Sequence, residues 1–262
     1  MKKKFIPQNM IPALCGVASI LAFLIFWFIS TNGTPFGKLI PRPDVVIISL
    51  FKSIFNPIGQ NTLFVHVGYS LYRVLMGYLI GSAIGIILGL AMGWSKVCES
   101  LFSPLYRIIR PIPPIAWIPI SIVWLGLGES AKIFLIFLTS FSNVTLNAWS
   151  GAKNVDPKLI GAAKMLGARK SQIFFTIVLP ASIPQIFAGL QVAMGRCWGT
   201  ILAAEMVRSS EGLGWIIVAG GNNNDMTQIL VGIVTIGVVG FILAVIMRKA
   251  EAVLCRWNKS GT

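Results

Sequence analysis

Long apolar segments alternate with short polar ones along the chain. Six segments carry apolar residues over most of their length: 11–30, 61–93, 101–125, 131–150, 181–205 and 226–247. A helix needs about 20 mostly apolar residues to cross the hydrocarbon layer of a bilayer. The pattern therefore predicts an all-α membrane protein with six transmembrane helices.

The first apolar segment follows the sequence MKKK, as in a secretory signal peptide. It is about 20 residues long, which exceeds a signal peptide's apolar core, so we expect an uncleaved helix with its N-terminus inside. Within 31–60, the sequence VVIISLFKSIF predicts a short amphipathic helix along the outer interface. We divide the chain into an N-terminal part (1–60), a core (61–250) with an inner loop at 152–180, and an inner tail (251–262).

Glycines and prolines mark two special segments. Gly81, Gly85, Gly89 and Gly93 recur every four residues and share one helix face, where another backbone can approach closely. Five prolines follow, namely Pro104, Pro111, Pro113, Pro114 and Pro119. They cannot all lie within one regular helix, and a helix broken at membrane depth is tolerated only inside protein or beside a cavity.

The predicted spans are joined by short connections. We expect an inner loop at 94–100, a tight outer loop at 126–130, and a turn-rich outer loop at 206–225.

Several polar side chains fall within the spans and are candidates for a translocation path or gate: Asn143, Asn147, Arg196, Trp198 and Glu205. Asn143 and Asn147 share a helix face, so they either join helices or line the path. Arg196 and Glu205 lie nine residues apart, about 13–14 Å along a helix, which is too far for a direct pair. Alternatively, Glu205 lies near the outer interface, where a charged side chain reaches water and needs no partner.

A capped helix–glycine–helix unit lies between two spans, at 156–180. Asp156-Pro157 is a helix-start signal, and Gly167 is a typical residue just beyond a helix end. Ser171 is expected to cap a second short helix at 172–178, which Pro180 would end.

Composition supports a membrane protein. Hydrophobic residues make up 55% of the 262 residues and charged residues 11%, while the formal net charge is +14. Most lysines and arginines fall in predicted inner segments, as expected when they set topology, so we expect no nucleic-acid partner. The cations of the predicted outer segments are Lys38, Arg42, Lys52, Arg73, Lys132 and Arg208.

Catalytic and metal-binding patterns do not stand out. Cys15, Cys98, Cys197 and Cys255 lie far apart, and His66 is the only histidine. The sequence contains no GxxxxGK[ST], HExxH or GxSxG pattern. We therefore expect no disulfide, no metal, no cofactor and no enzymatic activity in this chain.

Residues 161–180 resemble the cytoplasmic "EAA" signature of bacterial ABC-importer permeases. The matching residues are Gly161-Ala162-Ala163, Gly167-Ala168 and Ile177-x-Leu179-Pro180, with Gly161 where the family usually has glutamate. PRPDVV near position 41, together with 110–134 and 203–217, resembles the subfamily that imports nitrate, sulfonates and taurine.

The resemblance implies a type I (MetI-like) permease core in a bacterial cytoplasmic membrane, with both termini inside. It also implies a second copy of the permease, two cytoplasmic ATP-binding subunits that hold the ATP, and an extracytoplasmic substrate-binding protein. Coupling to the ATPase would involve Leu159, Gly161, Ala162, Ala163, Leu166, Gly167 and Ala168. The apolar side of the unit, with Leu159, Leu166, Ile173 and Phe174, would contact the partner or the membrane helices.

The leading hypothesis is an ATP-driven importer of small anionic or zwitterionic solutes that works by alternating access. The alternatives are an ion-coupled secondary transporter, which would need intramembrane carboxylates, and an intramembrane enzyme. Within the family, an importer of a thiamine-precursor pyrimidine is a further alternative.

Overall fold

The computed structural model describes residues 11–207 and 209–255, with side chains from residue 14 onward. These residues are almost entirely helical, and one isolated β-bridge joins Ile58 and Asn61. The predicted all-α class is confirmed. The N-terminal lysines, Arg208 and most of the predicted tail at 251–262 lie outside the described residues.

Five helices in the described ranges are long and apolar enough to span a membrane, and a sixth span results if one bent helix pair counts as one. The chain divides into two compact units, Met1–Leu63 with Ile216–Val234, and Phe64–Trp215 with Thr235–Thr262.

The first unit contains α1 (Ile11–Thr31), the short η2 (Pro35–Lys38) and α2 (Pro43–Phe55). Trp27 Nε1 donates a hydrogen bond to the Pro41 carbonyl at 3.2 Å, and the Arg42 guanidinium lies over the Phe28 ring. Arg42 also donates to Asp44, which holds the pKa of that carboxyl below its usual value. These contacts fix the turn between α1 and α2, and the predicted helix in VVIISLFKSIF is confirmed.

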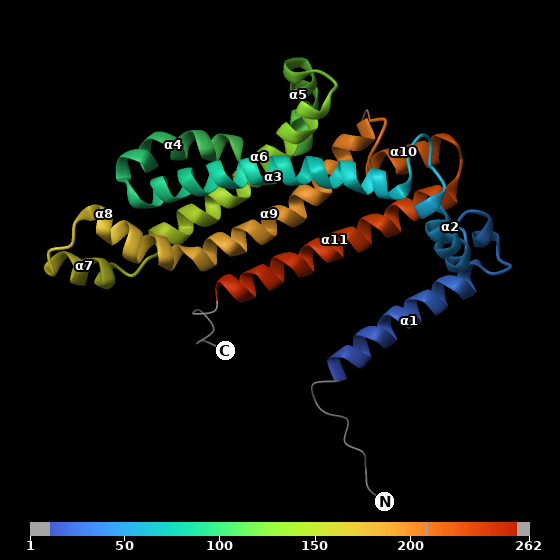
Figure 1. Cartoon of the computed structure of the whole chain (residues 1–262), viewed down its shortest axis with the longest axis horizontal. Helices are drawn as coiled ribbons and strands as arrows, with labels where there is room; N and C mark the ends of the chain where they lie inside the picture. Colours follow the sequence, from blue (N-terminus) through green and yellow to red (C-terminus); the bar gives the residue numbers. More distant parts are fainter. Residues whose placement is uncertain (1–10, 208, 256–262) are drawn as a thin grey trace, which may run out of the picture. The chain divides into compact units, whose positions relative to one another are not determined.

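The second unit is built on α3 (Leu63–Trp94), α6 (Glu129–Lys153) and α9 (Leu179–Val207), which are shown in Figure 1. The glycine face of α3 lies directly on α6. A Cβ added to Gly81 would lie 2.6 Å from the Phe137 carbonyl oxygen, and one added to Gly89 would lie 2.6 Å from the Ala148 Cβ. The predicted close approach of two backbones is therefore confirmed.

The proline-rich segment is broken, as predicted, at 110–113. α4 (Lys96–Ile109) ends there, and η3 (Pro114–Trp117) with α5 (Ile118–Leu125) continues at an angle of 87°. Pro104 is accommodated inside α4, and Pro119 occupies the first turn of α5. Only the cluster Pro111–Pro114 interrupts the span, because adjacent prolines remove successive backbone donors.

The predicted inner loop at 94–100 is wrong. α3 continues to Trp94, and Ser95 alone separates it from α4. The Ser95 hydroxyl accepts a hydrogen bond from the Cys98 N–H at 3.4 Å, so it serves as an N-cap that lets a new helix begin at once.

The predicted loop at 206–225 contains a helix, α10 (Leu213–Asn222), and α11 (Met226–Leu254) follows it after a short turn. The glycines at 220 and 221, interpreted as turn residues, are part of α10. A Cβ at Gly220 would lie 2.9 Å from the Ile229 side chain, so this glycine allows α11 to approach α10. The close packing of α10 and α11, rather than a turn, therefore explains the glycine at position 220.

Replacing Gly89 with alanine should destabilise the protein by about 1–3 kcal/mol, because the added methyl group overlaps α6. Gly68→Ala on the same helix is the matched control. A Cβ at Gly68 has no neighbour within 4 Å, so this change should be neutral or stabilise by about 0.5–1 kcal/mol. Thermal unfolding of the purified protein in detergent measures both. Equal unfolding midpoints for the two variants would contradict the close approach.

Candidate functional site

The capped unit at 156–180 contains α7 (Pro157–Met165), a glycine turn, and α8 (Lys170–Ile173). Asp156 Oδ1 accepts a hydrogen bond from the Lys158 N–H at 2.8 Å. At the other end, the Ala168 N–H donates to the Ala163 carbonyl and the Gly167 N–H to the Lys164 carbonyl, each at 3.0 Å. This is a Schellman motif, in which Gly167 adopts φ +80°, a conformation that favours glycine.

The second half of the unit differs from the prediction. α8 begins at Lys170, two residues before the predicted start, because the Gln172 side chain accepts from the Arg169 N–H at 2.7 Å. Pro180 does not end the helix. A π-helical turn, η4 (Phe174–Val178), precedes it, and α9 continues through it. A π turn widens the backbone where the proline ring would otherwise clash with the preceding carbonyl, so Lys170–Val207 is one continuous helical run.

The unit has an anchored side and an exposed side. Ile173 and Val178 are buried, and Ala163, Ala168 and Phe174 pack beside them against residues of α3, α6 and α9. The exposed side includes Leu159, Ala162, Met165, Leu166 and Gly167. Leu166 keeps 88% of its surface exposed. A Cβ at Gly161 would have no neighbour within 4 Å, so a larger side chain fits there.

The second candidate region is a cavity of about 380 Å³ beside the α4–α5 break. It brings together two predicted path residues, Asn143 of α6 and Arg196 of α9, with Thr139, Ser142 and Thr200. Arg110, at the end of α4, also lines it. The cavity therefore lies where the helix break was expected to border one.

The other predicted path residues lie elsewhere. Asn147 accepts a hydrogen bond from Gln185 at 3.2 Å and packs against Gly189, so it joins α6 to α9. Trp198 Nε1 donates to the Ile236 carbonyl of α11 at 3.1 Å, and its ring contacts Gly240. Neither residue lines the cavity, and their predicted roles in a path stay predictions.

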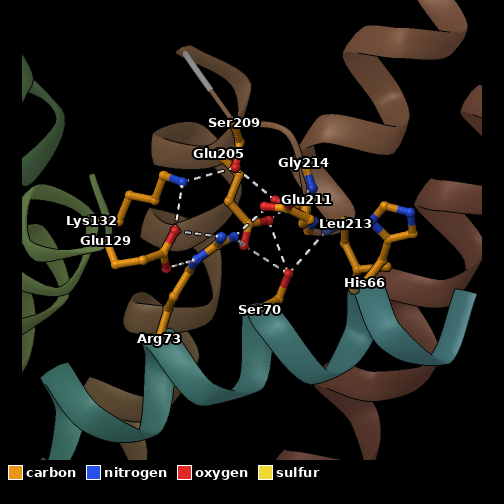
Figure 2. Close-up of polar contacts among 11 residues, drawn as sticks. His66, Ser70, Arg73, Glu129, Lys132, Glu205, Ser209, Glu211, Leu213 and Gly214 are labelled. Carbon is orange, nitrogen blue, oxygen red and sulfur yellow. Dashed lines mark hydrogen bonds and ion pairs between the residues drawn. The ribbon is translucent and has the colours of Figure 1, made fainter. Parts of the chain in front are cut away.

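Glu205 lies in a buried network of charges, shown in Figure 2. Its carboxylate accepts hydrogen bonds from Arg73 of α3 at 2.7 Å, from the Ser70 hydroxyl at 2.8 Å, and from the Gly214 N–H at 2.9 Å. Arg73 also forms an ion pair with Glu129 at the start of α6. As expected, Glu205 does not pair with Arg196.

The same network holds the segment 209–214. The Glu211 carbonyl accepts from Arg73 at 2.9 Å, the Gly212 N–H donates to His66 Nδ1 at 3.1 Å, and the Leu213 N–H donates to the Ser70 hydroxyl at 3.0 Å. Lys132 binds both Glu129, at 3.1 Å, and the Ser209 hydroxyl, at 2.9 Å. Three spanning helices and one connection therefore share one polar cluster.

Glycine is required where this connection meets the carboxylate. Gly212 has φ +116°, and a Cβ there would lie 2.4 Å from the Glu205 carboxyl carbon. A Cβ at Gly214 would lie 2.5 Å from the Leu202 carbonyl oxygen. The glycines of the sequence GLGW, within the predicted outer loop at 206–225, let the backbone approach a buried charge.

Sequence reasoning missed most of this cluster. The sequence places Arg73 and Lys132 among the cations of the predicted outer segments, but both are buried within helices and paired with carboxylates. The available signal was the spacing of His66, Ser70 and Arg73. Positions i, i+4 and i+7 share one helix face, and a polar face on an otherwise apolar span needs polar partners.

Removing the Arg73 charge should destabilise the protein strongly. Arg73→Met leaves Glu205 buried with no cation, which should cost about 3–5 kcal/mol of unfolding free energy. Lys153→Met is the control, because Lys153 pairs with Glu99 while half exposed and its loss should cost at most about 1 kcal/mol. Thermal unfolding in detergent measures both variants. The double variant Arg73→Met/Glu205→Gln should recover part of the loss, and equal effects of the two single changes would contradict the assignment.

Comparisons with a family model, with curated proteins and with solved structures all match the same kind of protein. The family model described as "Binding-protein-dependent transport system inner membrane component" matches residues 81–252. The chain is 32% identical over 245 residues to the taurine transport system permease protein TauC of Escherichia coli, covering 93% of this chain and 88% of that protein. It is 33% identical to the nitrate import permease protein NrtB of a Synechocystis strain over 230 residues, which cover 86% of this chain and 83% of that one.

A solved structure of the MetNI methionine ABC transporter, in an inward-facing conformation, shares the fold. Its matching chain has a TM-score of 0.64 and 19% sequence identity, and the match covers 73% of this chain and 95% of that chain. The expected MetI-like core is therefore confirmed. Because the family model spans the cavity, the capped unit and Glu205, and the curated relatives extend over most of both chains, this protein belongs to the family of inner membrane components of binding-protein-dependent ABC transport systems.

Proposed function

We propose that this permease is the membrane-spanning subunit of an ATP-driven importer of small anionic or zwitterionic solutes, such as a sulfonate, taurine or nitrate. It would act as a homodimer with two cytoplasmic ATPase subunits, which bind the ATP, and an external binding protein. The names of its relatives support this substrate class, because they include taurine and nitrate permeases. Both termini would lie on the cytoplasmic side.

The exposed side of the capped unit carries the proposal. Leu159, Met165 and Leu166 are large apolar side chains at the surface, next to the exposed cations Lys158, Lys164, Arg169 and Lys170. The cations favour a cytoplasmic location by the positive-inside rule and argue against burial in lipid. An apolar surface flanked by charge, at the end of a membrane bundle, is suited to a soluble partner.

The anchored side would transmit the partner's movement. Ile173 and Phe174 attach α8 to the bundle, and α8 continues through η4 into α9. A displacement of α8 would therefore move α9, which carries Arg196 at the cavity and Glu205 in the charge cluster. Alternating access would follow as α9 changes its packing on α6.

Transport assays with the assembled complex in vesicles test this function. Uptake of a radiolabelled sulfonate or nitrate should continue when an uncoupler collapses ion gradients and should stop when ATP is withdrawn. The opposite result would support an ion-coupled secondary transporter. The network around Glu205 does not favour that alternative, because three donors already occupy this carboxylate.

The glycine turn should be essential for coupling. Gly167→Val forces a branched side chain into a φ of +80°, so the α7–α8 angle should change and ATP-driven uptake should fall at least about tenfold. The membrane helices should remain folded, as judged by gel filtration and thermal unfolding.

Gly161→Glu is the matched control on the same unit. A glutamate fits the open space at this position and replaces a helix-interior glycine that costs about 1 kcal/mol relative to alanine. Coupling should be unchanged or stronger. Unchanged uptake in Gly167→Val, or loss of coupling in Gly161→Glu, would show that the unit contacts its partner differently.

A further inference from the structure

Six basic residues in or beside α3, α4, α6 and α9 fall into two groups. Arg73 and Lys132 pair with buried or half-buried carboxylates, while Arg107 and Lys153 lie over the Trp149 ring. The second group is Arg110 and Arg196, which both line the cavity beside the α4–α5 break. Among the described residues that line this cavity, none is a carboxylate.

Arg196 is the more unusual of the two. It lies near the middle of α9, where an arginine costs about 2.5–3.5 kcal/mol on insertion scales. Within residues 11–207 and 209–255, no hydrogen bond or ion pair reaches its guanidinium group. Arg196 is exposed in the single chain and lines the cavity, so its guanidinium group can meet water or a ligand there.

Three other polar groups of the cavity already donate to backbone carbonyls. The Thr200 hydroxyl donates to the Arg196 carbonyl, the Thr139 hydroxyl to the Leu135 carbonyl, and the Asn143 amide to the Thr139 carbonyl. A hydroxyl has only one proton to donate. The two guanidinium groups are the charged donors of the cavity, while Asn143, Ser142 and Trp117 offer neutral ones, so the lining suits a ligand that accepts hydrogen bonds and carries negative charge.

The helix break explains how such a cavity exists. Pro111, Pro113 and Pro114 replace a straight span with an 87° bend, which leaves room between α4, η3, α6 and α9. Prolines have no backbone N–H, so a bend made of them leaves carbonyl groups without helical partners, and such a backbone is tolerated at membrane depth only beside protein or a wet cavity. The volume of about 380 Å³ accommodates a small solute with some of its water.

We propose that Arg196, assisted by Arg110, forms an oxyanion-binding subsite in this cavity, through which a sulfonate, nitrate or similar small anion passes. A guanidinium group binds two oxygens of such an anion through parallel N–H donors, which gives both charge and shape selectivity. The subsite deepens the proposed function and rests on it, since it assigns the anionic part of the substrate to named residues.

Transport variants of the assembled complex test the subsite. Arg196→Gln should lower the maximal rate of ATP-driven anion uptake by roughly 10- to 100-fold, the loss expected for a charged hydrogen bond. The affinity of the binding protein for the anion should not change. Arg196→Lys should retain part of the rate, and Arg110→Gln should have a smaller effect. Arg107→Gln, which removes a cation over Trp149 outside the cavity, is the control and should keep the wild-type rate.

A chemical probe tests the charge of the cavity without knowledge of the natural substrate. Gly199 lines the cavity on α9, and a Cβ there has no neighbour within 4 Å, so Gly199→Cys places a thiol in it. The reaction rates of a sulfonate-bearing and an ammonium-bearing thiosulfonate reagent are compared, each relative to a free thiol. The anionic reagent should be favoured by roughly tenfold, and adding Arg196→Gln should remove the preference.

The outcomes separate the two proposals. If the wild-type complex imports no anion, or imports it without ATP, the proposed function fails. If it imports an anion with ATP but Arg196→Gln transports at the wild-type rate, or the reagent preference is unchanged by this substitution, the subsite fails and the function stands. Loss of both uptake and reagent preference in Arg196→Gln, with Arg107→Gln unaffected, supports the subsite.

Discussion

The contact between Arg73 and Glu205 is the constraint on which the second unit depends. Both side chains are almost completely buried in spanning helices, and neither could remain charged there alone. Their pairing fixes α3 against α9, and the second pair with Glu129 adds α6. The glycine face of α3 makes this possible, because α3 lies directly on α6 and Arg73 can reach the Glu129 side chain.

The connection at 209–214 follows from the same constraint. A buried carboxylate needs several hydrogen bonds, and side chains alone do not supply them all at Glu205. The backbone N–H of Gly214 completes the set, and the Gly212 position leaves no room for a side chain. One polar cluster thereby holds the end of α9, the beginning of α10 and three helix faces. Separate surface contacts would instead leave each element free to move.

The basic residues of this bundle differ in whether a carboxylate of the protein pairs with them. Arg73 and Lys132 are satisfied by Glu129 and Glu205, so their role is structural. Arg196 and Arg110 face a cavity without carboxylates, and their charge is available to a ligand. Residue type and position do not separate the two pairs, because all four residues are arginines or lysines in or beside spanning helices. What separates them is whether a carboxylate of the protein pairs with the charge.

Local patterns predicted the spans, the glycine face, the proline break and the helix end at Gly167, because each depends on residues within one or two helical turns. The charge cluster was not predicted, since Arg73 and Glu205 lie 132 positions apart and no local sequence pattern indicates that they pair. The continuation of α9 through Pro180 was missed for a different reason. A π turn depends on how Ile173 and Val178 pack, and this packing is tertiary.

That continuation has a mechanical consequence. A helix ended at Pro180 would leave the capped unit joined to the bundle by a flexible loop, and movement of the unit would be absorbed there. An unbroken run over Lys170–Val207 instead connects the unit, the cavity arginine and the charge cluster through helical backbone. Hydrogen bonding along it is altered at η4 (Phe174–Val178), directly beside the anchored residue Ile173, and at Pro184, which lies inside α9 and has no N–H to donate. Bending is therefore expected between Phe174 and Pro184, so that Arg196 and Glu205 would lie together on the far side of the bend.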